Sequence, residues 1–188
     1  MENEINKKLQ ERILSGTDLS RIVIAHRDFP SEPKKAFRKW DRKTPYSVHP
    51  IWCATTIATE TTLDETTRLE GYLALLYHDT LEDSTMPLPD DLPTRIKQLV
   101  QEMTFSGGSK QEMQEIWTKP KEVKLYKLYD KVSNLLDGNW MTDEKRQAYE
   151  DYTHALSKDV IKNYGELNIT QLAKNILGIQ EMKGDSEK

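Results

Sequence analysis

Side chains of the kind that bind metals and move protons occur together near the middle of the chain. The stretch Leu73–Asp83 is apolar at first and ends in the sequence HDTLED. Residues four positions apart on a helix share a face, so the sequence predicts that His78 lies over Glu82 and Asp79 over Asp83. Three carboxylates beside an apolar face repel one another unless a cation or a bound substrate compensates their charge. We therefore expect this stretch to carry chemistry.

Two residues elsewhere in the chain complete a candidate metal-binding set. His49 stands at the expected start of one helix, and Asp130 falls on the polar face of another. Together with His78 and Asp79 they offer two imidazoles and two carboxylates. This mixed nitrogen and oxygen set suits a divalent transition metal and leaves positions open for water and a phosphate oxygen. The alternative for each residue is an ordinary structural or exposed role.

Length and composition limit the classes of protein to consider. The 188 residues suffice for one domain with a real core. The net charge of −4 and the dispersed basic residues argue against a nucleic-acid-binding protein. The apolar runs are too short to span a bilayer, and the single cysteine, Cys53, has no internal disulfide partner. We expect an intracellular, cytoplasmic protein of undetermined oligomeric state.

The apolar residues recur with helical spacing throughout, and no segment alternates as a strand would. The sequence therefore predicts an all-α chain, in which Thr62 opens a capping box before the central helix. Residues 106–109 are expected to form a flexible joint and 182–188 a polar tail. The main predicted helices cover residues 3–15, 50–61, 64–83, 94–103, 122–136, 143–164 and 169–177.

A basic segment framed by prolines separates the apolar segment 21–26 from the helix predicted over 50–61. It runs from Asp28 to Thr44 and contains Lys34, Lys35, Arg38 and Lys39 among its cations. Runs of charge usually face water, which favours a solvated loop. The alternative is that Arg38 and Lys39 contact an anionic substrate.

Three sequence segments carry a resemblance to a known family. They are TPYSVHP at 44–50, LLYHDTLED at 75–83 and KLYDKVSNL at 127–135. Together they resemble the H…HD…D signature of the HD phosphohydrolase superfamily, whose fold is an all-helical metal-binding domain. More narrowly, they resemble the hydrolase domain of the bifunctional alarmone synthetase/hydrolases and the stand-alone small alarmone hydrolases. The resemblance implies one HD domain over residues 1–181, without synthetase activity because few residues follow the matched region.

The resemblance also implies the composition of the active site. One divalent ion, typically manganese in this family, is expected to be bound by His49, His78, Asp79 and Asp130. Glu82 and Asp83 correspond to the acidic pair that assists the attacking water and handles protons. Both assignments remain expectations from the family pattern.

Further residues match the family's substrate contacts. Arg38 and Lys39 correspond to an Arg-Lys pair that contacts the nucleotide, and Asn134 to an amide near the ribose and phosphates. Tyr149 matches an aromatic residue at the nucleotide pocket, although the alignment can slip by three residues onto Tyr152. The implied partner is a small-molecule nucleotide.

The implied reaction is hydrolysis of the 3′-diphosphate of guanosine tetra- or pentaphosphate, which releases pyrophosphate and GDP or GTP. Tyr77 and Tyr129 stand where the family often has smaller residues, and we expect them at the pocket mouth, where they affect base specificity. Lys127 is expected at the surface or behind the metal ligands. The alternatives are an HD-type phosphatase acting on a deoxynucleotide or NADPH, and a non-catalytic nucleotide-binding regulator.

Overall fold

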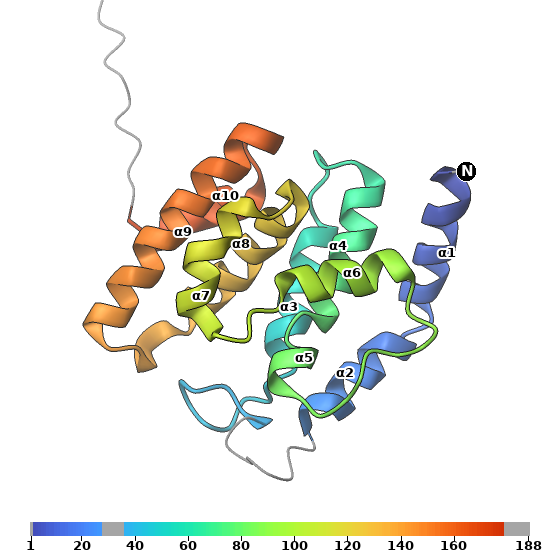
Figure 1. Cartoon of the computed structure of the whole chain (residues 1–188), viewed down its shortest axis with the longest axis horizontal. Helices are drawn as coiled ribbons and strands as arrows, with labels where there is room; N and C mark the ends of the chain where they lie inside the picture. The colour runs from blue at the N-terminus through green and yellow to red at the C-terminus, as the bar shows by residue number, and fades with distance from the viewer. Residues whose placement is uncertain (1, 28–35, 179–188) are drawn as a thin grey trace, which may run out of the picture.

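The computed structural model describes residues 2–27 and 36–178. Within these ranges the regular structure is helical, apart from one isolated bridge between Phe37 and Pro45 (Figure 1). The prediction of an all-α chain is confirmed. The predicted tail at 182–188 and the first part of the basic segment, residues 28–35, lie outside the described residues.

The helices follow the order that the apolar pattern predicts, with boundaries that shift by a few residues. They are α1 (Glu2–Leu14), α2 (Thr17–Arg27), α3 (Val48–Ala58), α4 (Glu65–Tyr77), α5 (Thr80–Asp83), α6 (Thr94–Met103), α7 (Gly108–Glu115), α8 (Lys121–Leu136), α9 (Asp143–Tyr164) and α10 (Asn168–Ile176). Short 3-10 turns, η2 (Ile116–Thr118) and η3 (Gly138–Trp140), flank α8. Among the described residues, no helix has both the length and the apolar character that crossing a bilayer requires.

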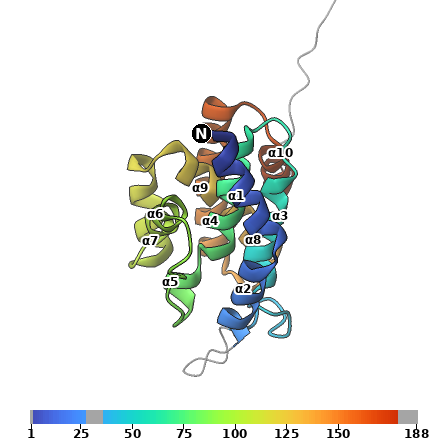
Figure 2. The same ribbon diagram turned by 90° about the vertical axis from the view of Figure 1, so that its right-hand side faces the viewer.

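Helix α4 lies at the centre of the bundle. It packs against α3, α6, α1 and α8, while α9 and α10 cover the far side of α8 (Figures 1 and 2). Gly71 allows the close approach, because a Cβ atom there would collide with Ile57 of α3 and Tyr126 of α8. The apolar face of α4 is fully buried at Leu73 and Leu76. Helices α3, α4 and α8 are therefore closely packed, and the positions of their ends relative to one another are fixed.

Acidic side chains, rather than the predicted capping box, accept hydrogen bonds at two helix starts. Asp64 caps α4 by accepting the Thr67 N–H at 2.8 Å, so the cap lies two residues after the predicted Thr62. Glu60 holds the start of α10 by accepting the N–H groups of Asn168 and Ile169 at 3.0 and 2.9 Å. These contacts keep α3, α4 and α10 in register around the core.

The continuous helix predicted over 64–83 is wrong at one point. Helix α4 ends at Tyr77, and α5 begins at Thr80. The carbonyl of Leu75 would accept the Asp79 N–H in an unbroken helix, but it receives the Nδ1–H of His78 at 2.6 Å. The histidine side chain thus competes with the backbone, and the chain turns at His78 and Asp79.

The predicted joint at 106–109 is also wrong. Gly108 adopts a φ of +65°, which an L side chain rarely tolerates, and it begins α7. The connection between α6 and α8 therefore contains a helix of its own. This helix brings Glu112 to a buried position against α8.

Candidate metal and nucleotide site

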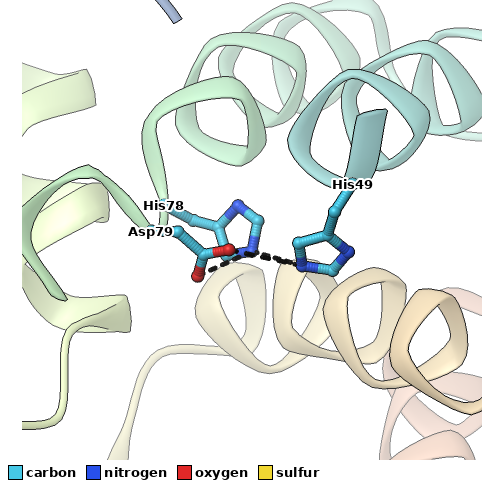
Figure 3. A group of neighbouring side chains, drawn as sticks. All are labelled: His49, His78 and Asp79. Carbon is cyan, nitrogen blue, oxygen red and sulfur yellow. Dashed lines mark hydrogen bonds and ion pairs between the residues drawn. The ribbon is translucent and has the colours of Figure 1, made fainter. Parts of the chain in front are cut away.

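Three buried side chains from separate elements converge on one point. His49 lies in the first turn of α3, and His78 and Asp79 lie in the turn between α4 and α5 (Figure 3). The two Nε2 atoms are 3.2 Å apart. The Asp79 oxygens lie 3.1 Å from His78 Nε2 and 3.4 Å from His49 Nε2. One potential ligand atom from each residue lies within 4.8 Å of the others, so this group can hold a divalent metal ion.

The outer ring nitrogens fix how the imidazoles face this point. Nδ1 of His78 donates to the Leu75 carbonyl, which can only accept, so Nε2 presents its lone pair to the cluster. Nδ1 of His49 contacts the Ser133 hydroxyl at 2.8 Å. Burial lowers the pKa of His49. Burial also opposes the charged form of His78, but the carboxylates of Asp79 and Asp130 together outweigh it and raise that pKa. A cation among these donors satisfies both nitrogens and the carboxylate at once.

Asp130 approaches the same point from α8. Its Oδ1 lies 3.3 Å from His49 Nε2 and 3.8 Å from His78 Nε2. Its Oδ2 lies 3.0 Å from Lys127 and 3.1 Å from Lys131. Burial alone would raise the pKa of Asp130, but the two ammonium groups hold it well below its usual range. The structure thus brings the four residues of the expected ligand set together and keeps Asp130 ionised.

The lysines behind Asp130 belong to a buried ionic network that the sequence did not indicate. Lys127 and Lys131 contact Glu112 of α7 at 3.0 and 2.9 Å. Glu112 also accepts from the Tyr152 hydroxyl at 3.0 Å. Of the two positions expected for Lys127, the structure gives the one behind the metal ligands, since only 3% of it is exposed and it contacts Asp130. This network holds one oxygen of Asp130 and leaves the other facing the imidazoles.

Glu82 and Asp83 lie about one helical turn after Asp79, because Asp79 is the N-cap of the short helix α5. The Asp79 carbonyl accepts the N–H groups of Glu82 and Asp83 at 3.2 and 2.7 Å. Glu82 Oε1 accepts the Phe105 N–H at 2.7 Å, and burial raises the Glu82 pKa. Asp83 Oδ2 lies 3.1 Å from the Tyr46 hydroxyl. Both carboxylates line the pocket described next.

A pocket of about 730 Å³ opens beside the cluster. Its acidic end contains Asp79, Glu82, Asp83 and Asp130. The remaining wall is rich in cations, namely Arg38, Lys39, Arg42, Lys131 and Lys145. A cavity of this size, lined by both carboxylates and cationic side chains, fits an anionic ligand whose one end meets a bound cation.

Arg38 is buried in the pocket wall, contrary to the prediction of a solvated loop. Its guanidinium makes two bonds to Asp137, at 2.6 and 2.8 Å, and one to Asn134 at 3.1 Å. Asn134 in turn donates to Asp130 at 2.6 Å. The Arg38 guanidinium and the Asn134 amide therefore lie next to each other, in contact with the cluster. The role of Asp137 had no signal in the sequence, because 99 positions separate it from Arg38.

Aromatic rings line the basic side. Lys39 and Lys145 approach the Trp140 ring at 4.4 and 4.7 Å from its centroid. Burial, and then the charges of Lys39 and Lys131, lower the pKa of Lys145. Tyr149 lines the pocket, whereas Tyr152, the alternative alignment, binds Glu112.

Two tyrosines that we expected at the pocket mouth lie elsewhere. The Tyr77 hydroxyl donates to Asp18 at 2.6 Å, and the Tyr129 hydroxyl donates to Glu60 at 2.9 Å. Both residues are fully buried and point away from the pocket. The helical spacing of the two tyrosines indicates that they are buried, but it does not show which residue accepts the hydrogen bond of each hydroxyl.

Comparisons with known proteins bear on the fold. No protein-family model matches the chain, and no curated protein does. One similar solved structure is a metazoan ortholog of SpoT, described as hydrolysing ppGpp and playing a role in starvation responses. It matches with a TM-score of 0.66 at 23% sequence identity, over 86% of this chain and 92% of that chain. The two chains share one fold along most of their length.

Proposed function

We propose that this protein is a metal-dependent phosphohydrolase that removes the 3′-diphosphate from guanosine tetra- and pentaphosphate. The products are pyrophosphate and GDP or GTP. The observation that carries the proposal is the position of the His49, His78 and Asp79 cluster at the acidic end of a pocket with a basic wall. The shared fold supports it, because the similar metazoan protein is described as hydrolysing ppGpp.

The donor atoms of the cluster fit a divalent ion. His49, His78, Asp79 and Asp130 would hold it, with Nε2 of both imidazoles and one oxygen of each carboxylate. Mixed nitrogen and oxygen donors suit a divalent transition metal, and we propose manganese because it is typical of the family that the sequence resembles. When bound, a divalent ion supplies Lewis-acid chemistry that makes water a nucleophile near neutral pH and polarises a phosphoryl oxygen.

The acidic pair of α5 handles protons in this proposal. Glu82 stays partly exposed, and the desolvation of its inner side raises the pKa towards the range in which a carboxylate exchanges protons efficiently. Its Oε1 is held by the Phe105 N–H, which fixes the direction of Oε2. Asp83 is positioned on the same turn. These two groups orient the attacking water and deliver a proton to the leaving oxygen.

The basic wall binds the substrate. The buried guanidinium of Arg38 and the ammonium of Lys39 offset the negative charge of the phosphates. Asn134 lies between Arg38 and Asp130 and offers an amide near the reacting group. Tyr149 and its neighbours supply an aromatic surface for the nucleoside. The proposed substrate is an intracellular nucleotide, so we place the enzyme in the cytoplasm.

A product assay tests the proposal. Purified protein loaded with manganese is offered ppGpp, NADPH and a panel of deoxynucleotides, with Asp79→Ala as the inactive control. We expect pyrophosphate and GDP from ppGpp, released by the unmutated protein alone. Orthophosphate from NADPH or a deoxynucleotide would instead identify a different HD-type phosphatase. Tight nucleotide binding without turnover would indicate a non-catalytic regulator.

A further inference from the structure

Tyr46 lies at the junction of the metal cluster and the acidic pair. The segment before α3 holds its backbone, since Tyr46 N–H donates to the Ala36 carbonyl at 2.8 Å beside the Phe37–Pro45 bridge. Its ring packs against His26 at 4.9 Å between centroids and meets the His49 ring edge-on at 5.9 Å. The ring is therefore clamped between two helices, and its hydroxyl has a fixed position.

That hydroxyl bridges two carboxylates. It lies 2.6 Å from Asp79 Oδ2 and 3.1 Å from Asp83 Oδ2. Like charges one helical turn apart repel each other, so Asp79 and Asp83 would tend to rotate apart without a group between them. The shorter contact is a charge-assisted bond from the phenol to Asp79. The second contact sets the distance between the two carboxylates.

The same ring also supports the basic side of the pocket. The guanidinium carbon of Arg38 lies 5.5 Å from the Tyr46 ring centroid. Tyr46 thus touches a candidate metal ligand, a candidate acid–base residue and a candidate substrate contact. No other residue that lines the pocket is described with all three of these contacts.

We propose that Tyr46 is a positioning residue. Its hydroxyl holds the Asp79 carboxylate in the orientation that faces His49 and His78, and it holds Asp83 at a fixed distance from that carboxylate. The part concerning Asp83 rests on the proposed function. The part concerning Asp79 requires only that the cluster binds a divalent ion. Partners that orient a metal ligand typically change metal affinity by 10- to 100-fold when they are removed.

The chain offers a matched control for this hydroxyl. Tyr77 donates to the buried carboxylate Asp18 over the same distance, 2.6 Å, away from the pocket. Tyr46→Phe and Tyr77→Phe each delete one phenol–carboxylate bond and keep the ring. A purely structural role would give both variants the same profile.

The test measures manganese affinity by titration calorimetry and the steady-state constants for ppGpp hydrolysis. We expect Tyr46→Phe to bind manganese at least tenfold more weakly and to lose kcat by about tenfold or more, with KM changed less than threefold. Tyr77→Phe should keep the manganese affinity and kcat of the unmutated protein. Manganese affinity that is unchanged in Tyr46→Phe, or absent from the unmutated protein, would overturn the role at Asp79.

A double-mutant cycle keeps the second part testable. Asp83→Asn should lower kcat, and adding Tyr46→Phe to it should lower kcat further by much less than Tyr46→Phe does alone. Fully additive losses would overturn the link to Asp83. If the unmutated protein hydrolyses none of the nucleotides while Tyr46→Phe still loses manganese affinity, the proposed function fails and the role at Asp79 stands. Circular dichroism verifies that each variant is folded.

Discussion

Two buried aspartates in this protein have similar surroundings and opposite consequences. Asp18 and Asp79 are both mostly buried, and each accepts a tyrosine hydroxyl at 2.6 Å. Asp18 also receives the Arg12 guanidinium on both of its oxygens, at 2.6 and 2.8 Å. The oxygens of Asp79 face two imidazole nitrogens instead. One carboxylate is matched by fixed positive charge, and the other is matched only when a cation is added.

The difference separates a structural cluster from a ligand site. Arg12 and Arg21 tie α1 and α2 to the loop at Asp91 as well as to Asp18. The charge-assisted, bidentate bonds from Arg12 occupy both oxygens of Asp18, which adds to stability and leaves this carboxylate little capacity for a ligand. The Asp79 cluster keeps lone pairs directed at one point, which costs stability unless an ion binds. Burial of a carboxylate therefore does not by itself distinguish a structural residue from a ligand. The distinction depends on whether fixed positive charges or only lone-pair donors surround it.

The largest expected effect is on turnover. Asp79→Asn should lower kcat for ppGpp about a thousandfold, since it removes part of a metal interaction worth about 4 kcal/mol. Asp18→Asn is the matched change in the other cluster and should leave kcat within about twofold. Steady-state kinetics of both variants verifies this. Equal losses in the two would show that the clusters do not differ as we describe.

The reverse contrast is expected in stability. Asp18→Asn should lower the free energy of unfolding by about 3 kcal/mol, because it leaves the bidentate Arg12 guanidinium without its charged partner. Without added metal, Asp79→Asn should cost less or even stabilise, since it relieves charge among the carboxylates. Urea unfolding in the presence of a chelator measures both. A larger loss for Asp79→Asn would contradict the comparison.

Metal binding should stabilise the protein through the Asp79 cluster and not through the Asp18 cluster. Manganese at one hundred times its dissociation constant should raise the free energy of unfolding by about 2.7 kcal/mol in the unmutated protein. The same rise is expected in Asp18→Asn, and none in Asp79→Asn. Thermal or urea unfolding with and without manganese tests this, with magnesium as a second ion for comparison.

A third buried imidazole, that of His26, sharpens the comparison further. Only 1% of His26 is exposed, and neither ring nitrogen has a hydrogen-bond partner among the described residues. Burial lowers its pKa to about 4. The unfolded chain takes up a proton below about pH 6.5 and the folded chain only below about 4, so stability falls as the pH drops through this interval.

The expected size follows from these two values. At pH 5 the His26 contribution should lower the free energy of unfolding by about 2 kcal/mol relative to pH 8. His26→Phe keeps a ring against Tyr46 and should remove this part of the acid sensitivity. His154→Gln is the control at a less buried histidine. Urea unfolding at both pH values gives the difference, and identical pH dependence in His26→Phe and the unmutated protein would exclude this role.

Helical period and local sequence were enough to predict much of the fold. The all-α architecture, the order of the long helices and the bounds of α6 and α9 agree with the apolar pattern. The four residues of the expected ligand set could be identified because each lies in a segment whose sequence is distinctive, and they do lie together in the structure. The predictions were wrong where a single residue changed the backbone path that the local pattern indicated. His78 takes a backbone acceptor and ends α4, and a glycine opens α7 in a segment we expected to be a joint.

The sequence by itself determined which residues are able to bind a metal and which faces of the helices are apolar. Only the tertiary structure decided the partners. It buried Lys127 against Glu112, turned the hydroxyls of Tyr77 and Tyr129 away from the pocket, and placed the hydroxyl of Tyr46 between two carboxylates. The physical reason is that periodicity reports burial along one helix. The pairing of buried polar groups depends on contacts between residues that lie tens of positions apart.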